Sequence, residues 1–229
     1  MVDLFGEVVA NFKNFKQDRV NKNNERKLKM SDRKKFVDEL KDFFNSNDSV
    51  ALITGMDDKE KLIRTLNELN RMYKKGTIYT NILKYLPDQL NDKFGHENKV
   101  FPREITKSTK TKFGNMTLKF NKYSENGSSS LVQKEDDFAL YFPIQSVLKE
   151  DKATENLIEH INLNEAPKKI LITTNDLKLD ICKLKPVVDT YIHYEVKNDN
   201  KEIYENSKKT LKSTPPGCEI NPVYKNLID

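Results

Sequence analysis

Residues 54–62 place a glycine and a lysine, groups that could bind phosphate, between an apolar run and a helical pattern. Gly55 lies near the start of this segment, and Lys61 follows six residues later. Such a glycine lets backbone N–H groups wrap an anion, and such a lysine reaches the outer phosphates. Leu62, however, stands where a hydroxyl would hold Mg²⁺. Three acidic residues add opposing charge, although acids also favour any helix N-terminus: Asp57, Asp58 and Glu60. The segment therefore predicts weak phosphate binding or none.

A second set of residues could hold a metal ion and activate water. Glu195 and Lys197 form a Glu-x-Lys pattern at the end of a strand pattern, and Asp189 or Asp180 could supply a first carboxylate. This pattern resembles that of metal-dependent nucleases of the PD-(D/E)XK kind. Two carboxylates would hold Mg²⁺, and the lysine would help to activate the attacking water. Glu-x-Lys is also common on surface strands of a chain this rich in charge. A structural strand is the favoured interpretation.

A third set is basic and interleaved with aromatic residues. Phosphate contacts combined with base stacking are typical of single-strand nucleic-acid binding. The aromatic residues are Phe113, Phe120 and Tyr123. An ordinary hairpin whose aromatic residues face the core explains the pattern equally well. The six cations of the set are Arg103, Lys107, Lys110, Lys112, Lys119 and Lys122.

Metal binding by histidine is not predicted. The three histidines are scattered along the chain and have no cysteine or acidic partner at ligand spacing. The two cysteines, Cys182 and Cys218, also lack such spacing, and a reduced intracellular compartment explains them most simply.

The elements that would position these residues follow from apolar spacing. Helices are predicted from a Ser31 N-cap onward, over 59–75 with Gly76 as its stop, and over 153–161. Short apolar runs predict strands over 50–53, 77–80, 116–123, 138–144, 169–173 and 190–196. Strands that alternate with helices favour a mostly parallel sheet covered on both faces.

Two of these junctions resemble the core of P-loop NTPases of the AAA+ or RecA-like kind. The segment that contains Gly55 and Lys61 occupies the place of the Walker A loop. The strand that ends in Thr173, Thr174 and Asn175 resembles the sensor strand, whose polar tip meets the γ-phosphate in that family. The preceding strand, at the Walker B place, ends without a carboxylate. The resemblance implies a nucleotide-dependent assembly scaffold, and the departures imply that turnover has been lost.

Composition sets outer limits on function. Net charge is +5, charged residues make up 33% of the chain, and no stretch has the length and apolarity of a membrane span. A mildly basic balance is compatible with nucleic acid without requiring it. An intracellular protein is expected, cytoplasmic or, in a eukaryote, possible in the nucleus.

The sequence predicts an α/β fold with a mostly parallel, P-loop NTPase-like sheet flanked by helices. A basic N-terminal helical segment (1–47) precedes the α/β domain (48–206), which contains a hairpin insertion (84–135); an extended tail (207–229) follows. The expected function is a catalytically impaired binding or assembly subunit, associated with DNA or RNA and with a protein partner or further copies of itself. No cofactor is expected, and ATP with Mg²⁺ is disfavoured. The alternatives are the nuclease and a protein-interaction module without a nucleic-acid role.

Overall fold

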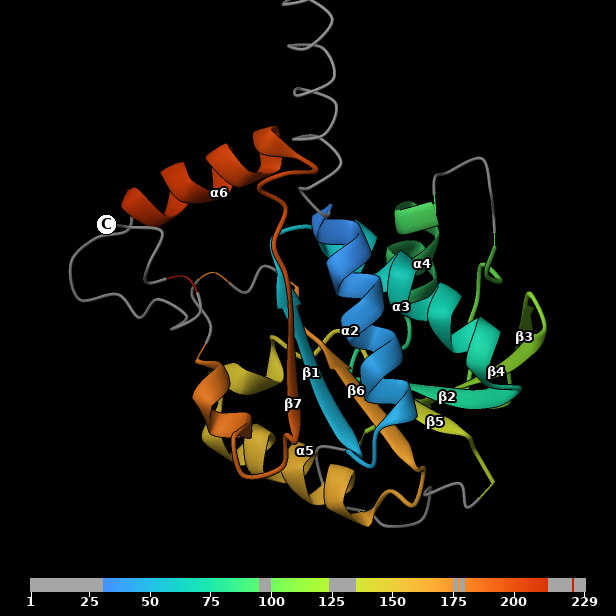
Figure 1. Cartoon of the computed structure of the whole chain (residues 1–229). Helices are drawn as coiled ribbons and strands as arrows, with labels where there is room; N and C mark the ends of the chain where they lie inside the picture. Colours follow the sequence, from blue (N-terminus) through green and yellow to red (C-terminus); the bar gives the residue numbers. More distant parts are fainter. Residues whose placement is uncertain are drawn as a thin grey trace, which may run out of the picture.

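A computed structural model describes residues 31–94, 100–123, 135–174, 177, 180–213 and 224 of the chain. These residues form a single sheet with helices on both faces (Figure 1). The elements, in chain order, are α2 (Asp32–Asn45), β1 (Val50–Gly55), α3 (Asp58–Met72), β2 (Lys75–Thr80), α4 (Leu86–Phe94), β3 (Lys110–Phe113), β4 (Met116–Lys122), β5 (Phe138–Tyr141), η1 (Val147–Lys149), α5 (Asp151–Leu163), β6 (Lys168–Ile172), η3 (Ile181–Leu184), β7 (Thr190–Tyr194) and α6 (Lys201–Lys212).

The sheet has seven strands in the order β3-β4-β2-β5-β6-β1-β7. Every neighbouring pair is parallel except β3 and β4, which form an antiparallel hairpin. The prediction of a mostly parallel α/β sheet is therefore confirmed. β1 and β2 run parallel, as expected of a βαβ unit, and β6 and β5 lie between them.

Two layers of helix cover the sheet and bury its strands. Side chains of α2, α3 and α4 share one apolar core with one face of the sheet, and α5, η1 and η3 share a second core with the other face. All residues of β1 and β5 are buried, as is typical of parallel strands covered on both faces.

α2 begins and is stabilised as its sequence pattern predicts. The Ser31 hydroxyl accepts a hydrogen bond from the backbone N–H of Lys34 and so caps the first turn. Phe36, Leu40 and Phe43 lie on the buried face of the helix. This part of the predicted segment 1–47 is helical, whereas residues 1–30 lie outside the described part of the chain.

Three sequence expectations need correction. Gly76 was expected to stop a helix, but α3 ends at Met72 and Gly76 lies inside β2. An added Cβ at Gly76 would lie 2.4 Å from the ring of Phe138, which explains the glycine. The expected extended tail is helical over 207–212, because these residues form the second half of α6. The expected insertion 84–135 contributes β3 and β4 to the main sheet.

Two aspartates bind the backbone at the amino ends of strands. The Asp189 carboxylate accepts hydrogen bonds from the N–H groups of Ser49 and Val50, both at 2.9 Å. Asp137 accepts from the N–H groups of Lys74 and Lys75, at 2.9 and 3.0 Å. These carboxylates satisfy N–H groups that precede or begin β1 and β2, so their role here is structural.

A buried lysine joins α2 to β6. The ammonium of Lys168 donates to the carbonyl oxygens of Phe43, Ser46 and Asp48, at 2.8, 2.9 and 2.6 Å. Carbonyl groups at a helix C-terminus lack partners within the helix and favour positive charge. Burial lowers the pKa of Lys168, and the nearby Asp48 and Asp189 oppose that shift. Lys168 therefore acts as the C-terminal cap of α2.

A polar cluster lies within the core between the sheet and α5. The Tyr141 hydroxyl forms a hydrogen bond with Nδ1 of His160 at 2.9 Å and accepts one from Asn164 at 3.2 Å. The His160 ring also packs edge-on against Tyr79. Burial lowers the pKa of His160 from 6.5 to about 4, so the imidazole is neutral in the folded protein near neutral pH.

We expect His160 to make stability depend on pH. The unfolded chain takes up this proton below pH 6.5 and the folded chain only near pH 4. Its contribution is therefore complete above pH 6.5 and lost as pH falls toward 4, a loss of about 2–3 kcal/mol after allowance for partial exposure. Urea unfolding of the wild type and His160→Gln across this range measures it. The wild type should lose more stability than the variant as pH falls, and parallel curves would contradict the assignment.

None of the helices in the described residues has both the length and the apolarity needed to cross a membrane.

Candidate functional site: the carboxyl ends of β1 and β6

The adjacent carboxyl ends of β1 and β6 form a topological switch point. α3, which follows β1, packs on one face of the sheet, whereas η3, which follows β6, packs on the other. In open parallel sheets, ligands bind in the crevice where neighbouring strands send their connections to opposite sides. The sequence-predicted residues Gly55, Lys61 and Thr174 all belong to this region. Asn175, the fourth predicted nucleotide-site residue, lies outside the described part of the chain.

Lys61 links the two strand ends from within the protein. Its Nζ donates to the carbonyl oxygens of Gly55 at 2.7 Å and Thr173 at 2.9 Å, and lies 3.0 Å from Oδ1 of Asp58. The Lys61 side chain is 0% exposed. We call this set of contacts the Lys61 bridge. In this conformation the ammonium contacts backbone carbonyls and a carboxylate and is not accessible to a phosphate in solvent.

Gly55 is required by the geometry of the strands. Its φ of +141° lies in a region that residues with a side chain rarely adopt. A Cβ at this position would lie 2.4 Å from the carbonyl oxygen of Tyr194 on β7. The close contact between β1 and β7 therefore explains this glycine without a bound phosphate.

Acidic residues occupy the N-terminus of α3. The Asp57 carboxylate accepts from the N–H of Glu60 at 2.9 Å and caps the helix. The Glu60 carboxylate pairs with both Arg33, at 3.0 Å, and Arg64, at 2.9 Å. The Glu60 N–H and the side chains of Arg33 and Arg64 could have met an anion at this helix terminus, and all three already have carboxylate partners from the chain itself.

The Arg33–Glu60 pair also reaches the end of β7. Arg33 also lies close to the Tyr194 side chain, which packs in the core against Phe36. Burial, together with the nearby Asp199 and Glu60 carboxylates, raises the pKa of Tyr194 to about 12, so its hydroxyl is neutral. These contacts among Arg33, Glu60 and Tyr194 connect α2, α3 and β7 near the switch point.

Sequence reasoning missed Arg33 and Arg64 as members of this region. Arg64 follows Glu60 by four residues on α3, a spacing that places the two side chains on one helix face. That spacing could have indicated their pairing. No local pattern connects Arg33 to Glu60, because α2 and α3 meet only in the folded protein.

Two further sequence predictions concern the carboxyl ends of β6 and β5, namely the sensor strand and the strand at the Walker B place. Thr174, after β6, is 8% exposed, so little of it faces solvent. At the Walker B place, β5 ends at Tyr141 and Gln145 follows, as the sequence shows. Asp137 lies at the amino end of β5 and binds the backbone before β2. A carboxylate suited to Mg²⁺ is thus not placed at the tip of β5.

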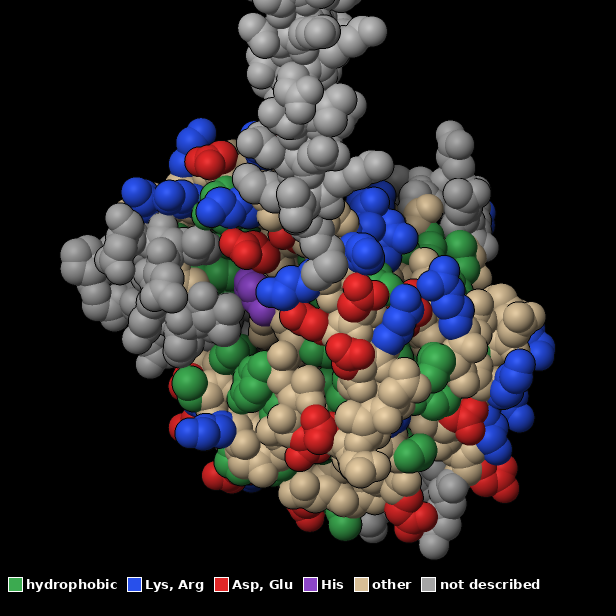
Figure 2. Space-filling view, viewed as in Figure 1, with side chains coloured by type: hydrophobic (Ala, Val, Ile, Leu, Met, Phe, Trp, Pro, Cys, Tyr) green, Lys and Arg blue, Asp and Glu red, His purple; other side chains and the backbone are tan. Residues whose placement is uncertain are grey.

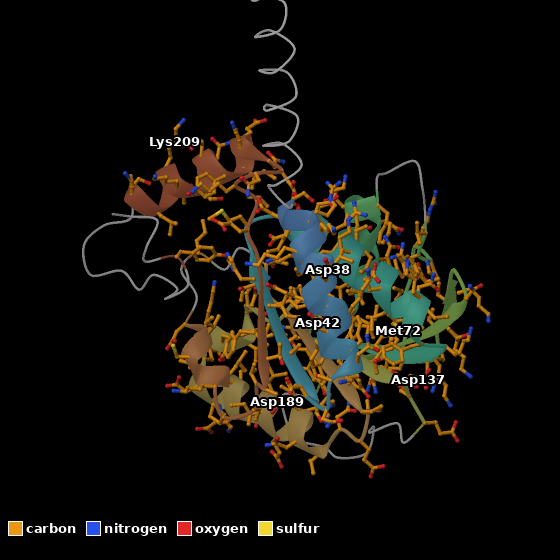
Figure 3. All side chains as sticks on the ribbon, viewed as in Figure 1. Asp38, Asp42, Met72, Asp137, Asp189 and Lys209 are labelled. Carbon is orange, nitrogen blue, oxygen red and sulfur yellow. The ribbon has the colours of Figure 1, made fainter. Side chains whose placement is uncertain are left out.

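The structure does not bring the candidate nuclease residues together. Asp189 is at the amino end of β7, at the opposite end of the sheet from α6 and its Lys209 (Figure 3). Glu195 lies six residues further on, roughly 20 Å along an extended chain. Lys197 lies over the Tyr204 ring, 5.9 Å from its centroid. Asp180 accepts from the N–H of Cys182 and caps η3. Within the described residues, no group of three or more His, Cys, Asp or Glu side chains could hold a metal ion.

The six basic residues lie on β3, β4 and the segment before them. Figure 2 shows Lys and Arg side chains along the margin of the molecule at which Figure 1 places β3. Arg103, Lys107, Lys110, Lys112 and Lys122 are exposed, and Lys119 is half-buried. The aromatic residues of the pattern are buried instead: Phe113, Phe120 and Tyr123 are 7%, 1% and 5% exposed. The alternative of a hairpin whose aromatic residues face the core therefore describes the structure, and the stacking role is not supported.

Comparison of the chain with known protein families, with curated protein sequences and with solved structures gave no match. The fold and the contacts at the switch point place the chain in the α/β class, with a mostly parallel sheet flanked by helices.

Proposed function

We propose that the chain is a P-loop-type scaffold whose phosphate site is closed, and that it acts as a binding or assembly subunit without nucleotide turnover. The observation that supports this most is the Lys61 bridge. A lysine that serves phosphates must reach solvent, whereas the Lys61 ammonium is fully buried against two carbonyl oxygens and Asp58.

The position of the bridge supports the P-loop resemblance. Lys61 joins the end of β1, the strand that would precede a phosphate loop, to Thr173 at the end of β6, the strand that resembles a sensor strand. These two strands are direct neighbours in the sheet. A phosphate loop and a sensor tip act on the same γ-phosphate and so require this adjacency.

Charge at the α3 terminus supports loss of turnover. Asp57, Asp58 and Glu60 surround the place where a triphosphate would lie, and each is engaged with a backbone or cationic group of the chain. A bound triphosphate would have to displace these contacts and tolerate the like charges. Retention of the scaffold without its chemistry fits a role in binding nucleic acid and protein partners or further copies of the same chain.

We expect the purified protein to bind ATP weakly or not at all, with or without Mg²⁺, and to release no phosphate above background. Calorimetric titration and a phosphate-release assay check this. Micromolar, Mg²⁺-dependent ATP binding with turnover would overturn the proposed closure, most clearly if Lys61→Met abolished turnover under conditions in which that variant remains folded.

A further inference from the structure

The basic hairpin, which we define as β3 and β4, carries Lys110, Lys112 and Lys119 on the face opposite to Phe113 and Phe120. Lys110 pairs in register with Lys119, and Lys112 with Thr117, so these four side chains share one face of the hairpin. Phe113 and Phe120 lie on the other face, where both rings pack with Phe101 in the core. The exposed face of the hairpin is therefore basic and offers no aromatic ring.

Not every lysine on that face is available to a ligand. The ammonium of Lys119 lies 3.2 Å from Oδ1 of Asp136, a buried carboxylate that also accepts a hydrogen bond from the hydroxyl of Thr77. Lys110 and Lys112 are exposed and form no ion pair with another of the described residues. They lie two residues apart on one strand, about 7 Å, which is close to two steps of about 3.4 Å, the rise per phosphate of one strand along the axis of the double helix.

Proteins that prefer single strands combine a basic groove with aromatic rings on which bases stack, worth about 1–3 kcal/mol per base. At this hairpin the rings are buried and only the phosphate contacts remain. Tyr123, the third aromatic residue of the pattern, donates its hydroxyl hydrogen to the carbonyl oxygen of Pro143 and is 5% exposed. Attraction to phosphates alone is strongest where phosphates are densest, which is on a double helix.

From these contacts we infer that the basic hairpin binds the phosphate backbone of duplex nucleic acid, through Lys110 and Lys112, and does not read or stack bases. This rests on the nucleic-acid role in the proposed function and names its ligand class. Duplex DNA and duplex RNA share this backbone chemistry, and the experiment separates them.

Fluorescence anisotropy of the full chain with a labelled DNA duplex, an RNA duplex and a single DNA strand of equal length tests the inference. At low salt at least one duplex should bind about tenfold more tightly than the single strand. The duplex has the denser phosphates, and the hairpin has no exposed ring on which the bases of a single strand could stack. In Lys110→Gln/Lys112→Gln, the slope of log K against log salt for the DNA duplex should become shallower by about 1.8, which is 0.9 for each lost phosphate contact.

The matched control is Lys152→Gln/Lys185→Gln, which removes two exposed lysines on α5 and after η3. It should leave the slope and the preference unchanged. A single strand that binds as tightly as both duplexes, or a slope unaffected by the Lys110 and Lys112 substitutions, would overturn this inference alone. Absence of binding to all three probes at low salt would overturn the nucleic-acid role itself.

Discussion

Replacement of Lys61 by methionine is expected to lower the free energy of unfolding by about 3–5 kcal/mol, the usual cost of removing one partner of a buried ion pair. The substitution leaves the carbonyl oxygens of Gly55 and Thr173 without their donor and the Asp58 carboxylate without its cation. A lysine that served only a ligand would contribute little to the stability of the free protein. Equilibrium unfolding in urea measures the difference.

Lys59→Met is the matched control for this prediction. Lys59 is exposed on the same turn of α3, and its loss should change stability by no more than about 0.5 kcal/mol. The double variant Asp58→Asn/Lys61→Met should cost less than the sum of the two single changes, because the two side chains interact directly. Unchanged stability in Lys61→Met would show that the bridge does not hold the strand ends.

Lys168→Met is expected to have the second large effect, a loss of about 2–3 kcal/mol. Three carbonyl oxygens at and beyond the end of α2 lose their common donor: the Phe43 contact is buried, and the Ser46 and Asp48 contacts are partly buried. A buried acceptor without a partner costs about 1–3 kcal/mol, and one that water can reach costs less. The methionine retains much of the apolar contact with the Phe43 ring. Thermal and urea unfolding of the variant measure the loss.

Lys169 supplies the control for Lys168, because it is the next residue on β6 and only half-buried. Lys169→Met should leave stability within about 0.5 kcal/mol of the wild type. If both variants lost the same stability, the loss would come from removing a positive charge on β6 and not from removing the hydrogen bonds that Lys168 donates at the end of α2.

Elements with a strong apolar pattern could be predicted from the sequence, and weakly patterned ones could not. α2 has an N-cap serine and apolar residues at helical spacing, and β1 is a continuous apolar run, so both were predicted. α6 was not predicted, because just Tyr204 and Leu211 among its residues are buried. Two apolar positions seven residues apart give little signal in a polar segment.

In the candidate site, too, the parts that neighbouring residues determine could be predicted, and the contacts between distant residues could not. The sequence indicated that Gly55 and Lys61 lie between a strand and a helix, because neighbouring residues determine that junction. The direction of the Lys61 side chain could not be predicted, since its partner Thr173 is 112 residues away. The capping role of Asp189 likewise depends on β1, 139 residues earlier, which no local pattern encodes.

The accessibility of the Lys61 ammonium tests the closed phosphate site most directly. Competitive labelling of lysine amines under native conditions, read by mass spectrometry with and without millimolar Mg²⁺ and ATP, compares Lys61 with its exposed neighbour Lys59. The closed site predicts that Lys61 is among the least labelled lysines and that the nucleotide changes nothing. Labelling of Lys61 to the extent of Lys59, together with protection by ATP, would contradict it.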